Sequence, residues 1–408
     1  MKILHTADWH LGKRLESFSR LEEQREVLEE ITEIASTHKV DAVLIAGDLF
    51  DTYNPSTEAV ELFYKTLKKL SDNGCRPVIA IAGNHDSPDR IEAPDPLARE
   101  NGIIFAGYPG SQIRDFSLES GLKVKYSAPG FLEFNLPQNN YPLRLLMTPY
   151  ANEFRLRQFL GEDNDEATLR KLLQDRWQKL AEQYCDEGGV NILLSHLFVV
   201  KQGAELPEEP EDEKPILHVG GAQVVYSSNI PGNIQYTALG HLHRFQDVNN
   251  GEYSPVIYSG SPLSYSFSEA HQKKYVSVID AEPGQPVSYR KIELTKGKKL
   301  LRKRFENTLE AIEWLEANQD TLVELTMVAD EYLTSADRKR LNQAHDGIVT
   351  IIPEIRNKSQ SEDKDKSIDL QQSIPELFRQ YFIYKYSQEP NEEIMELFKE
   401  VQAEKTGE

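Results

Sequence analysis

The fold is decided near the start of the chain by the stretch Ile3-Leu4-His5-Thr6-Ala7-Asp8-Trp9-His10. Its apolar beginning is typical of a buried β-strand, and its polar end places a carboxylate and an imidazole directly after that strand. Helical spacing of apolar residues follows, and a second apolar stretch comes at Val43-Leu44-Ile45-Ala46. After a second helical repeat, a third apolar stretch lies at residues 78–82. This alternation predicts an α/β sheet with helices on its faces.

Further apolar stretches extend this layered structure toward the middle of the chain. We expect strands at residues 144–147, 191–194, 236–239, 255–258 and 275–279. We therefore interpret residues 1–285 as one domain.

The composition changes after residue 285. A basic run comes first, with Arg290, Lys291, Lys296, Lys298, Lys299, Arg302, Lys303 and Arg304. Helix, strand, helix and strand patterns follow, so residues 286–355 are predicted to form a small α+β domain. Residues 356–372 have the composition of a polar linker, and residues 373–408 return to helical spacing.

The overall charge limits the kinds of partner that the chain can bind. Its 408 residues include 46 Lys and Arg against 66 Asp and Glu, a formal net charge of −20 at pH 7. This excludes a uniformly basic nucleic-acid binder but not binding through a local patch or a bound metal. The two cysteines, Cys75 and Cys185, cannot form a disulfide framework. We therefore expect a reduced, cytoplasmic setting. No apolar stretch approaches the roughly 18–20 residues of a membrane span.

Five short polar motifs each follow a predicted strand. They are Asp8-Trp9-His10, Gly47-Asp48-Leu49-Phe50-Asp51, Gly83-Asn84-His85-Asp86, Ser195-His196 and Gly240-His241-Leu242-His243. Ligands of α/β sheets gather beyond the carboxyl ends of the strands. Residues i and i+2 of a strand point to the same side. We therefore expect Asp8 with His10, and His241 with His243, each to present two ligands to one site.

The chemistry of these side chains favours a binuclear metal site. The expected ligands are Asp8, His10, Asp48, Asn84, His196, His241 and His243. Carboxylate, carboxamide and imidazole groups without thiolate suit Mn²⁺, Fe²⁺ or Zn²⁺ and disfavour a structural zinc site. Because seven ligands are too many for one ion, we expect two ions that share Asp48. Ions roughly 3.5–4 Å apart clamp the attacking and leaving oxygens of a phosphoryl group. His85 is left to protonate or stabilise the leaving oxygen, with Asp86 to orient it.

The order of these motifs resembles that of the calcineurin-like metallophosphoesterase superfamily and, within it, the SbcD family of bacterial exonuclease subunits. The segments that carry the resemblance are residues 3–12, 46–51, 82–87, 238–243 and 258–262, with Ser266-Phe267. The likeness is specific through about residue 285 and looser in 328–333, which resembles the capping domain of that family.

The resemblance implies a four-layer calcineurin-like β-sandwich flanked by helices, a small α+β capping domain and C-terminal helices. It implies that one manganese is held by Asp8, His10, Asp48 and His243, and the other by Asp48, Asn84, His196 and His241, with His85 as the catalytic histidine. It also implies an SbcC-type ATPase with a coiled coil as partner. The complex would be a nucleoid-associated, ATP-dependent double-strand exonuclease and single-strand or hairpin endonuclease in DNA repair, recombination and replication.

Two later regions are candidates for interaction surfaces. We expect the basic run to contact DNA through Lys298, Lys299, Arg302 and Lys303. The aromatic tail is expected to dock on the coiled coil of the ATPase through Leu377, Phe378, Tyr381, Phe382, Ile394, Leu397 and Phe398. The family also forms homodimers, which implies two copies of this chain in a heterotetramer.

One position departs from part of the resemblance, and two other functions remain open. Archaeal and eukaryotic relatives commonly carry His where this chain has Asp51, so a role of that position in strand opening does not carry over. The first alternative is a phosphodiesterase that acts on small nucleotides. The second is a non-catalytic scaffold with a vestigial metal site, which the complete ligand set argues against.

Overall fold

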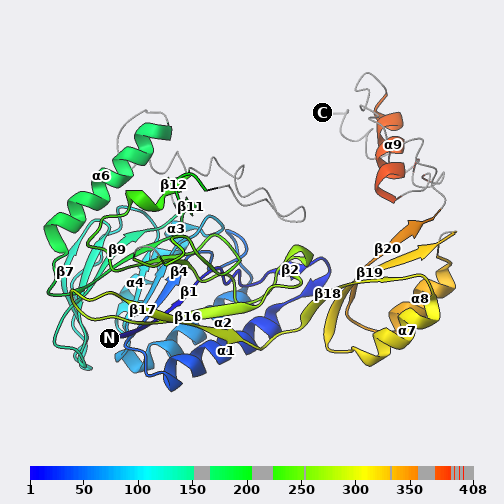
Figure 1. Cartoon of the computed structure of the whole chain (residues 1–408). Coiled ribbons are helices and arrows are strands. Elements are labelled where there is room, and N and C mark those ends of the chain that lie inside the picture. The colour runs from blue at the N-terminus through cyan, green and yellow to red at the C-terminus, as the bar shows by residue number, and fades with distance from the viewer. Residues whose placement is uncertain are drawn as a thin grey trace. The chain divides into compact units, whose positions relative to one another are not determined.

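The computed structural model describes residues 1–150, 166–204, 224–251, 254–330, 333–356 and 373–386, together with the single positions 390, 395 and 398. It divides the chain into two compact units, Met1–Glu354 and Ile355–Glu408 (Figure 1). The acidic stretch 205–213 and nearly all of the predicted linker 356–372 lie outside the described residues.

The first sheet of the described structure has six strands in the order β17-β16-β1-β4-β5-β6. Their bounds are Ser288–Leu294 for β17, Lys274–Asp280 for β16, Lys2–Thr6 for β1, Ala42–Ala46 for β4, Val78–Ile81 for β5 and Ile103–Ala106 for β6. Strands β1, β4, β5 and β6 are parallel, and β16 and β17 join the β1 edge antiparallel. The carboxyl ends of the parallel strands therefore meet along one edge.

The second sheet has seven strands among the described residues, in the order β14-β15-β13-β10-β9-β8-β7. Their bounds are Gln246–Asp247 for β14, Val256–Tyr258 for β15, Tyr236–Leu239 for β13, Val190–Ser195 for β10, Leu143–Thr148 for β9, Phe131–Asn135 for β8 and Lys123–Ala128 for β7. Its four central strands, β9, β10, β13 and β15, are parallel. This sheet supplies a second set of strand ends.

Three apolar cores separate four layers (Figure 1). Helices α1 (Leu21–Thr37) and α2 (Thr57–Leu70) cover the outer face of the first sheet, and α6 (Glu166–Tyr184) covers that of the second. Neighbouring residues of a strand enter different cores: Leu4 of β1 faces α1 and α2, whereas Ile3 faces the second sheet. Both faces of each sheet are thus covered, and the predicted four-layer sandwich is confirmed.

The structure contains elements that apolar stretches alone did not predict. Strand β17 follows the predicted boundary at residue 285, yet it pairs along its length with β16. The first sheet therefore continues to Leu294. Strands β6, β7 and β8 were also not predicted. Charged residues interrupt β7 and β8, whereas β6 is a short apolar stretch that is buried throughout. The short pairs β2 (Arg14–Leu15) with β3 (Phe18–Ser19), and β11 (Val199–Val200) with β12 (Val225–Tyr226), complete this part.

A three-stranded sheet follows, in the order β18-β19-β20. Its elements are β18 (Lys299–Phe305), α7 (Thr308–Ala317), β19 (Thr321–Ala329), α8 (Ser335–Ala344) and β20 (Ile348–Ile355). The two helices pack on one face around Leu315, Val323 and Leu325. A small cluster that includes Leu300 and Phe267 joins this sheet to the sandwich.

The second compact unit contains α9 (Ile374–Tyr386). The ring of Phe378 stacks on Phe398, with ring centroids 4.0 Å apart, and also contacts Phe382. Leu377 and Tyr381 belong to the same helix, whereas the predicted docking residues Ile394 and Leu397 lie outside the described residues.

Candidate metal centre

The seven predicted ligands lie in loops that follow parallel strands of both sheets. Asp8 and His10 follow β1, Asp48 follows β4, Asn84 follows β5, His196 follows β10, and His241 and His243 follow β13. The apolar sequences of the strands bury them between layers, so the polar residues that come next lie at the shared edge. All seven side chains are brought to the same region of the molecule.

Four of these residues have a left-handed backbone. Their φ angles are 52° for Asp8, 44° for His10, 45° for Asp48 and 102° for His241. Such angles are uncommon for residues other than glycine and cost of order 1–3 kcal/mol each. The side chains are therefore aimed by strained loops and not by the alternation of a strand. As a result His241 and His243 face different groups of ligands.

The first ligand group contains Asp8, His10, Asp48 and His243. The Nε2 atoms of His10 and His243 lie 3.0 Å apart, and His10 Nε2 lies 3.5 Å from Asp48 Oδ2. Asp8, His10 and Asp48 each offer a ligand atom within 4.8 Å of the others. One divalent ion fits this set of nitrogen and oxygen atoms.

The second ligand group contains Asp48, Asn84, His196 and His241. The Oδ1 atom of Asn84 lies 3.0 Å from both His196 Nε2 and His241 Nδ1. Asp48 Oδ2 lies 3.4 Å from His196 Nε2. The same carboxylate oxygen therefore faces both groups, which is the position expected of a bridging ligand.

Unsatisfied polar atoms test whether these groups fit metal ions. Asp8 Oδ2 and His241 Nε2 are buried without a hydrogen-bond partner among the described residues. Leaving a buried polar atom unpaired costs about 1–3 kcal/mol. Two imidazole nitrogens facing each other at 3.0 Å are likewise better satisfied by a cation between them than by one another. The donor set fits the two divalent metals that this fold implies.

Burial sets the charge of these groups in the metal-free protein. It lowers the pKa of His10 to about 4 and that of His241 to about 3. Burial raises the pKa of Asp8 to about 7. At His196, burial is outweighed by the carboxylates of Asp48 and Asp8, and its pKa is raised to about 9. His196 therefore carries the positive charge that a metal ion would supply beside Asp48.

Close packing between the loops explains two of the motif glycines. A Cβ atom at Gly240 would lie 1.7 Å from the carbonyl oxygen of Ala46, and one at Gly83 would lie 2.1 Å from Asp48 Oδ1. Neither contact is sterically tolerable. Loops from the two sheets can thus approach closely enough to share one site only because these positions lack a side chain.

The contacts of His85 differ from the prediction. Its Nδ1 lies 2.8 Å from the backbone carbonyl of Asp51, and its ring meets that of His10 edge to face at 4.8 Å. The carboxylate of Asp86 instead accepts hydrogen bonds from the backbone N–H groups of Leu49, Phe50 and Gly83 at 2.8–3.0 Å. Asp86 is therefore a residue that ties two loops together, and the contact predicted between Asp86 and His85 is replaced by one from Asp51.

Several supporting residues were missed by the motif analysis. Gln24 Nε2 donates to the carbonyl of His10 at 2.8 Å, and Tyr265 donates to the carbonyl of Trp9. Glu269 contacts His243 Nδ1 at 3.3 Å, and Lys274 contacts Glu269. These residues lie far from the motifs in sequence, so only the fold could bring them to the site.

Part of the basic run lies on β17, and its last three residues, Arg302, Lys303 and Arg304, have partners in the small sheet and its helices. Arg302 forms an ion pair with Glu324 at 2.7 Å, and Lys303 lies over the ring of Trp314. The side chains of Lys298 and Lys299 are exposed. Two of the four predicted DNA contacts thus have partners within the protein, although the side chain of Arg302 is also exposed, and the other two are Lys298 and Lys299.

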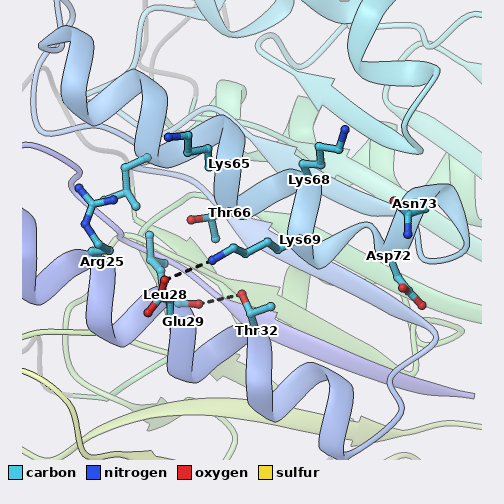
Figure 2. Close-up of a pocket in the computed structure, with 11 residues that line it drawn as sticks. Arg25, Leu28, Glu29, Thr32, Lys65, Thr66, Lys68, Lys69, Asp72 and Asn73 are labelled. Carbon is cyan, nitrogen blue, oxygen red and sulfur yellow. Dashed lines mark hydrogen bonds and ion pairs between the residues drawn. The ribbon is translucent and has the colours of Figure 1, made fainter.

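A surface pocket of about 360 Å³ lies between α1 and α2 (Figure 2). Two of its basic side chains are paired with acidic neighbours: Lys69 pairs with Glu29 at 3.2 Å, and Lys65 pairs with Glu61 at 2.5 Å. None of the predicted ligands lines it. It is therefore separate from the metal centre.

A family model and several known proteins are similar in sequence to this chain. Residues 1–245 match the family model described as calcineurin-like phosphoesterase. The chain is 36% identical to SbcD, the D chain of the nuclease SbcCD, of Bacillus subtilis (strain 168), over 98% of this chain and 97% of that protein. It is 30% identical to the protein of the same name from Escherichia coli (strain K12), over 83% and 81% of the two chains.

Two solved structures are more distant. TT1561 of Thermus thermophilus has 14% sequence identity and a TM-score of 0.37, over 71% of this chain and 98% of that one. A dimetal phosphatase from Danio rerio has 12% identity and a TM-score of 0.40, over 72% of this chain and 98% of that one.

Among the described residues, no helix is both long and apolar enough to cross a membrane.

Proposed function

From the premise that this chain belongs to the SbcD family of SbcCD nucleases, within the calcineurin-like phosphoesterases, we propose that it is the nuclease subunit of an SbcCD-like complex that cleaves DNA. Membership makes the chain a metal-dependent hydrolase of phosphodiester bonds. The observation that carries the proposal is the position of Asp48, whose Oδ2 lies 3.5 Å from His10 and 3.4 Å from His196. One carboxylate is thereby placed to serve two ions.

In this proposal Asp8, His10, Asp48 and His243 hold one metal, and Asp48, Asn84, His196 and His241 hold the other. We infer that the ions are Mn²⁺, since the ligands are imidazoles and hard oxygens without thiolate. When bound, two such metals polarise the phosphoryl group and supply a nucleophile from water at neutral pH.

The protein itself contributes orientation and proton transfer. His85 donates its Nδ1–H to the carbonyl of Asp51, which fixes the ring and leaves Nε2 to meet the leaving oxygen. Asp86 keeps the loops after β4 and β5 together through three backbone hydrogen bonds. We thus assign protonation or charge stabilisation at the leaving group to His85, and positioning to Asp86.

DNA as substrate and an SbcC-type ATPase as partner follow from the family and from two surfaces. Lys298 and Lys299 are exposed where β18 begins, and they are our candidates for DNA contact.

Ile374 and Tyr381 of α9 are 58% and 54% exposed. We propose that α9 docks on the coiled coil of the ATPase. Within that complex we expect ATP-dependent exonuclease activity on double-stranded ends and endonuclease activity on hairpins and single strands, in the cytoplasm.

A homodimer is part of the same proposal. Tyr64 on α2 is 36% exposed, and Leu97 on α4 (Asp95–Arg99) is 74% exposed. Both helices lie in the region where the family dimerises. A second copy of the chain that covered these side chains would remove apolar surface from water.

The proposal is tested by cleavage of end-labelled hairpin DNA in Mn²⁺, with and without the ATPase and ATP. We expect opened hairpins and shortened duplexes that require ATP and both proteins. Turnover of small phosphodiesters that exceeds turnover of linear duplex would instead favour the phosphodiesterase alternative.

Docking through α9 is tested by deleting residues 370–408. The deletion should abolish copurification with the ATPase while metal-dependent phosphodiesterase activity persists. A complex that survives the deletion contradicts docking through α9.

A further inference from the structure

In each ligand group, one ring nitrogen of a histidine points away from the other ligands. The kind of group that this nitrogen contacts differs between the two ligand groups. In the first group, His243 Nδ1 lies 3.3 Å from Glu269 Oε1, and His10 Nδ1 lies 3.7 Å from Asp51 Oδ1. In the second group, His196 Nδ1 lies 2.8 Å from the backbone carbonyl of Ala46. Asp8 Oδ1 is 3.8 Å from the same nitrogen, but Asp8 is itself a ligand of the first group. Carboxylates outside the ligand set therefore stand behind the first group, and a neutral carbonyl is the nearest partner behind His196.

Glu269 is held in place by a buried network. Its side chain is 2% exposed and that of Lys274 is 8% exposed, and the two form an ion pair. The Lys274 ammonium also donates to the carbonyl of His243 and to Ser261 Oγ, each at 3.0 Å. The backbone N–H of Tyr265 donates to Glu269 Oε1 at 3.2 Å. All three protons of the ammonium thus have acceptors, and the carboxylate has one orientation.

Asp51 repeats this arrangement on the other histidine. Its Oδ1 lies 2.9 Å from Lys13 Nζ, and its side chain is 20% exposed. His10, Asp51 and His85 also have the spacing of a metal site. The Lys13 ammonium, however, already occupies the cationic place beside this carboxylate. Asp51 is therefore better explained as support for His10 than as the ligand of a third ion.

We propose that Glu269 and Asp51, each paired with a lysine, are positioning residues that make the first metal site tighter than the second and fill it first. A carboxylate behind a histidine fixes the ring with its other nitrogen toward the metal and makes that nitrogen more basic. The buried negative charge also attracts a divalent cation. The backbone carbonyl behind His196 orients its ring without adding charge. This inference rests on the proposed binuclear function, since it assigns different affinities to its two sites.

The experiment is a calorimetric titration of Mn²⁺ into the full chain in two backgrounds. Asn84→Ala removes a ligand of the second site and leaves the first to be measured alone, whereas His243→Ala leaves the second. Adding Glu269→Gln should weaken Mn²⁺ binding about 10- to 100-fold in the first background and leave it unchanged in the second. Asp51→Asn should act in the same direction with a smaller effect, because its contact is longer and more exposed.

The matched control is Glu293→Gln. Glu293 forms an exposed ion pair with Lys273 at 2.8 Å, on the strands that also carry Lys274. Because Glu269→Gln leaves Lys274 buried without its partner, the double variant Glu269→Gln/Lys274→Met tests the same point in a neutral core. It should fold, with a metal-free melting temperature near that of the unmodified chain, and still bind Mn²⁺ more weakly at the first site.

The outcomes separate this inference from the proposed function. Absence of Mn²⁺ binding to the unmodified chain overturns both. Two bound Mn²⁺ ions with affinities that Glu269→Gln leaves unchanged, or weakens equally in both backgrounds, overturn the positioning role alone. An effect of Glu293→Gln as large as that of Glu269→Gln also overturns it.

Discussion

The metal centre and strand β18 are both rich in charged side chains, but they use them in opposite ways. At the metal centre, buried side chains from five loops converge, and Asp48 faces histidines of both sheets at 3.4–3.5 Å. On β18, the basic side chains spread along one strand, and Arg302 and Arg304 pair with Glu324 and Glu354. At the metal centre the fold brings carboxylates and imidazoles together, whereas on β18 acidic partners neutralise basic side chains.

This difference indicates where chemistry is to be expected. Groups that are buried together without enough partners gain most from a bound ion or substrate, because desolvation makes their interactions strong. Exposed ion pairs contribute only about 0–1 kcal/mol to the free energy of folding, and salt screens them. Substitutions at the metal centre should therefore have large effects, and substitutions on β18 should have small ones.

The largest effect is expected for Asp48→Asn. It removes the carboxylate shared by both ligand groups, so Mn²⁺ binding should be lost at both sites. We expect DNA cleavage to fall at least about 1000-fold, which corresponds to about 4 kcal/mol in the activation barrier. Calorimetry and cleavage of end-labelled duplex measure the two quantities. Asp280→Asn, an exposed carboxylate on β16, is the control and should leave both unchanged.

His85→Gln should separate catalysis from metal binding. Loss of the proton donor is expected to lower turnover about 100- to 10,000-fold. The affinity for Mn²⁺ should stay within error of the unmodified chain, because His85 belongs to neither ligand group. His271→Gln, at an exposed position, serves as the control. Near-normal cleavage by His85→Gln would remove this residue from the mechanism.

The pH dependence of metal binding should follow from His196. Its pKa is raised to about 9 in the metal-free protein, although burial opposes this, because the carboxylates of Asp48 and Asp8 favour the imidazolium. A histidine must be neutral to bind a metal. The affinity for Mn²⁺ should thus rise by up to about tenfold per pH unit between pH 7 and 9, with proton release that calorimetry in different buffers can count.

Rising pH should change the folding stability that His196 contributes in the opposite direction to the Mn²⁺ affinity. A pKa of about 9 in the folded state against 6.5 as the reference value means that the stability from His196 is present below pH 6.5. It is lost as the pH rises toward 9. The metal-free protein should therefore melt at lower temperature over the range in which Mn²⁺ binds more tightly. An equal pH dependence in a His196→Gln variant would show that other groups cause it.

The smallest effects are expected on β18 and just before it. Lys298→Glu with Lys299→Glu should weaken duplex binding several-fold and lower the slope of log affinity against log salt by about one for each phosphate that is no longer bound. Arg302→Gln should change binding less, since Glu324 already engages that side chain at 2.7 Å. A salt titration of duplex affinity measures both. If Arg302→Gln weakened DNA binding more than the double variant, this would contradict the expectation that a basic side chain already in an ion pair contributes less to DNA binding.

Much of the sandwich could be predicted because its strands are continuous apolar runs buried on both faces. Residues 42–46 and 236–239 are examples, and each strand is buried throughout. Strand β17 could not be placed in this way, since it carries Arg290 and Lys291, the first residues of the basic run. Only its pairing with β16 assigns it to the first sheet.

For the metal centre, the candidate ligands could be named from the sequence, because each motif combines a strand end with side chains of metal-binding type. The supporting contacts were not. Asp86 was expected to orient His85, but its carboxylate is used by three backbone N–H groups, and the carbonyl of Asp51 meets His85 instead. Backbone contacts of this kind leave no signature in side-chain patterns.

The sequence by itself determined the layered α/β architecture, the order of the motifs and the chemical class of the site, because hydrophobic periodicity and ligand type are local properties. The tertiary structure alone decided that Glu269 and Lys274 lie behind His243 and that Arg302 is paired. It also turned His241 and His243 toward different neighbours, where strand alternation predicted one site for both. These features depend on residues far apart in the chain. They exist only once the two sheets have packed together and the loops at their edges have met.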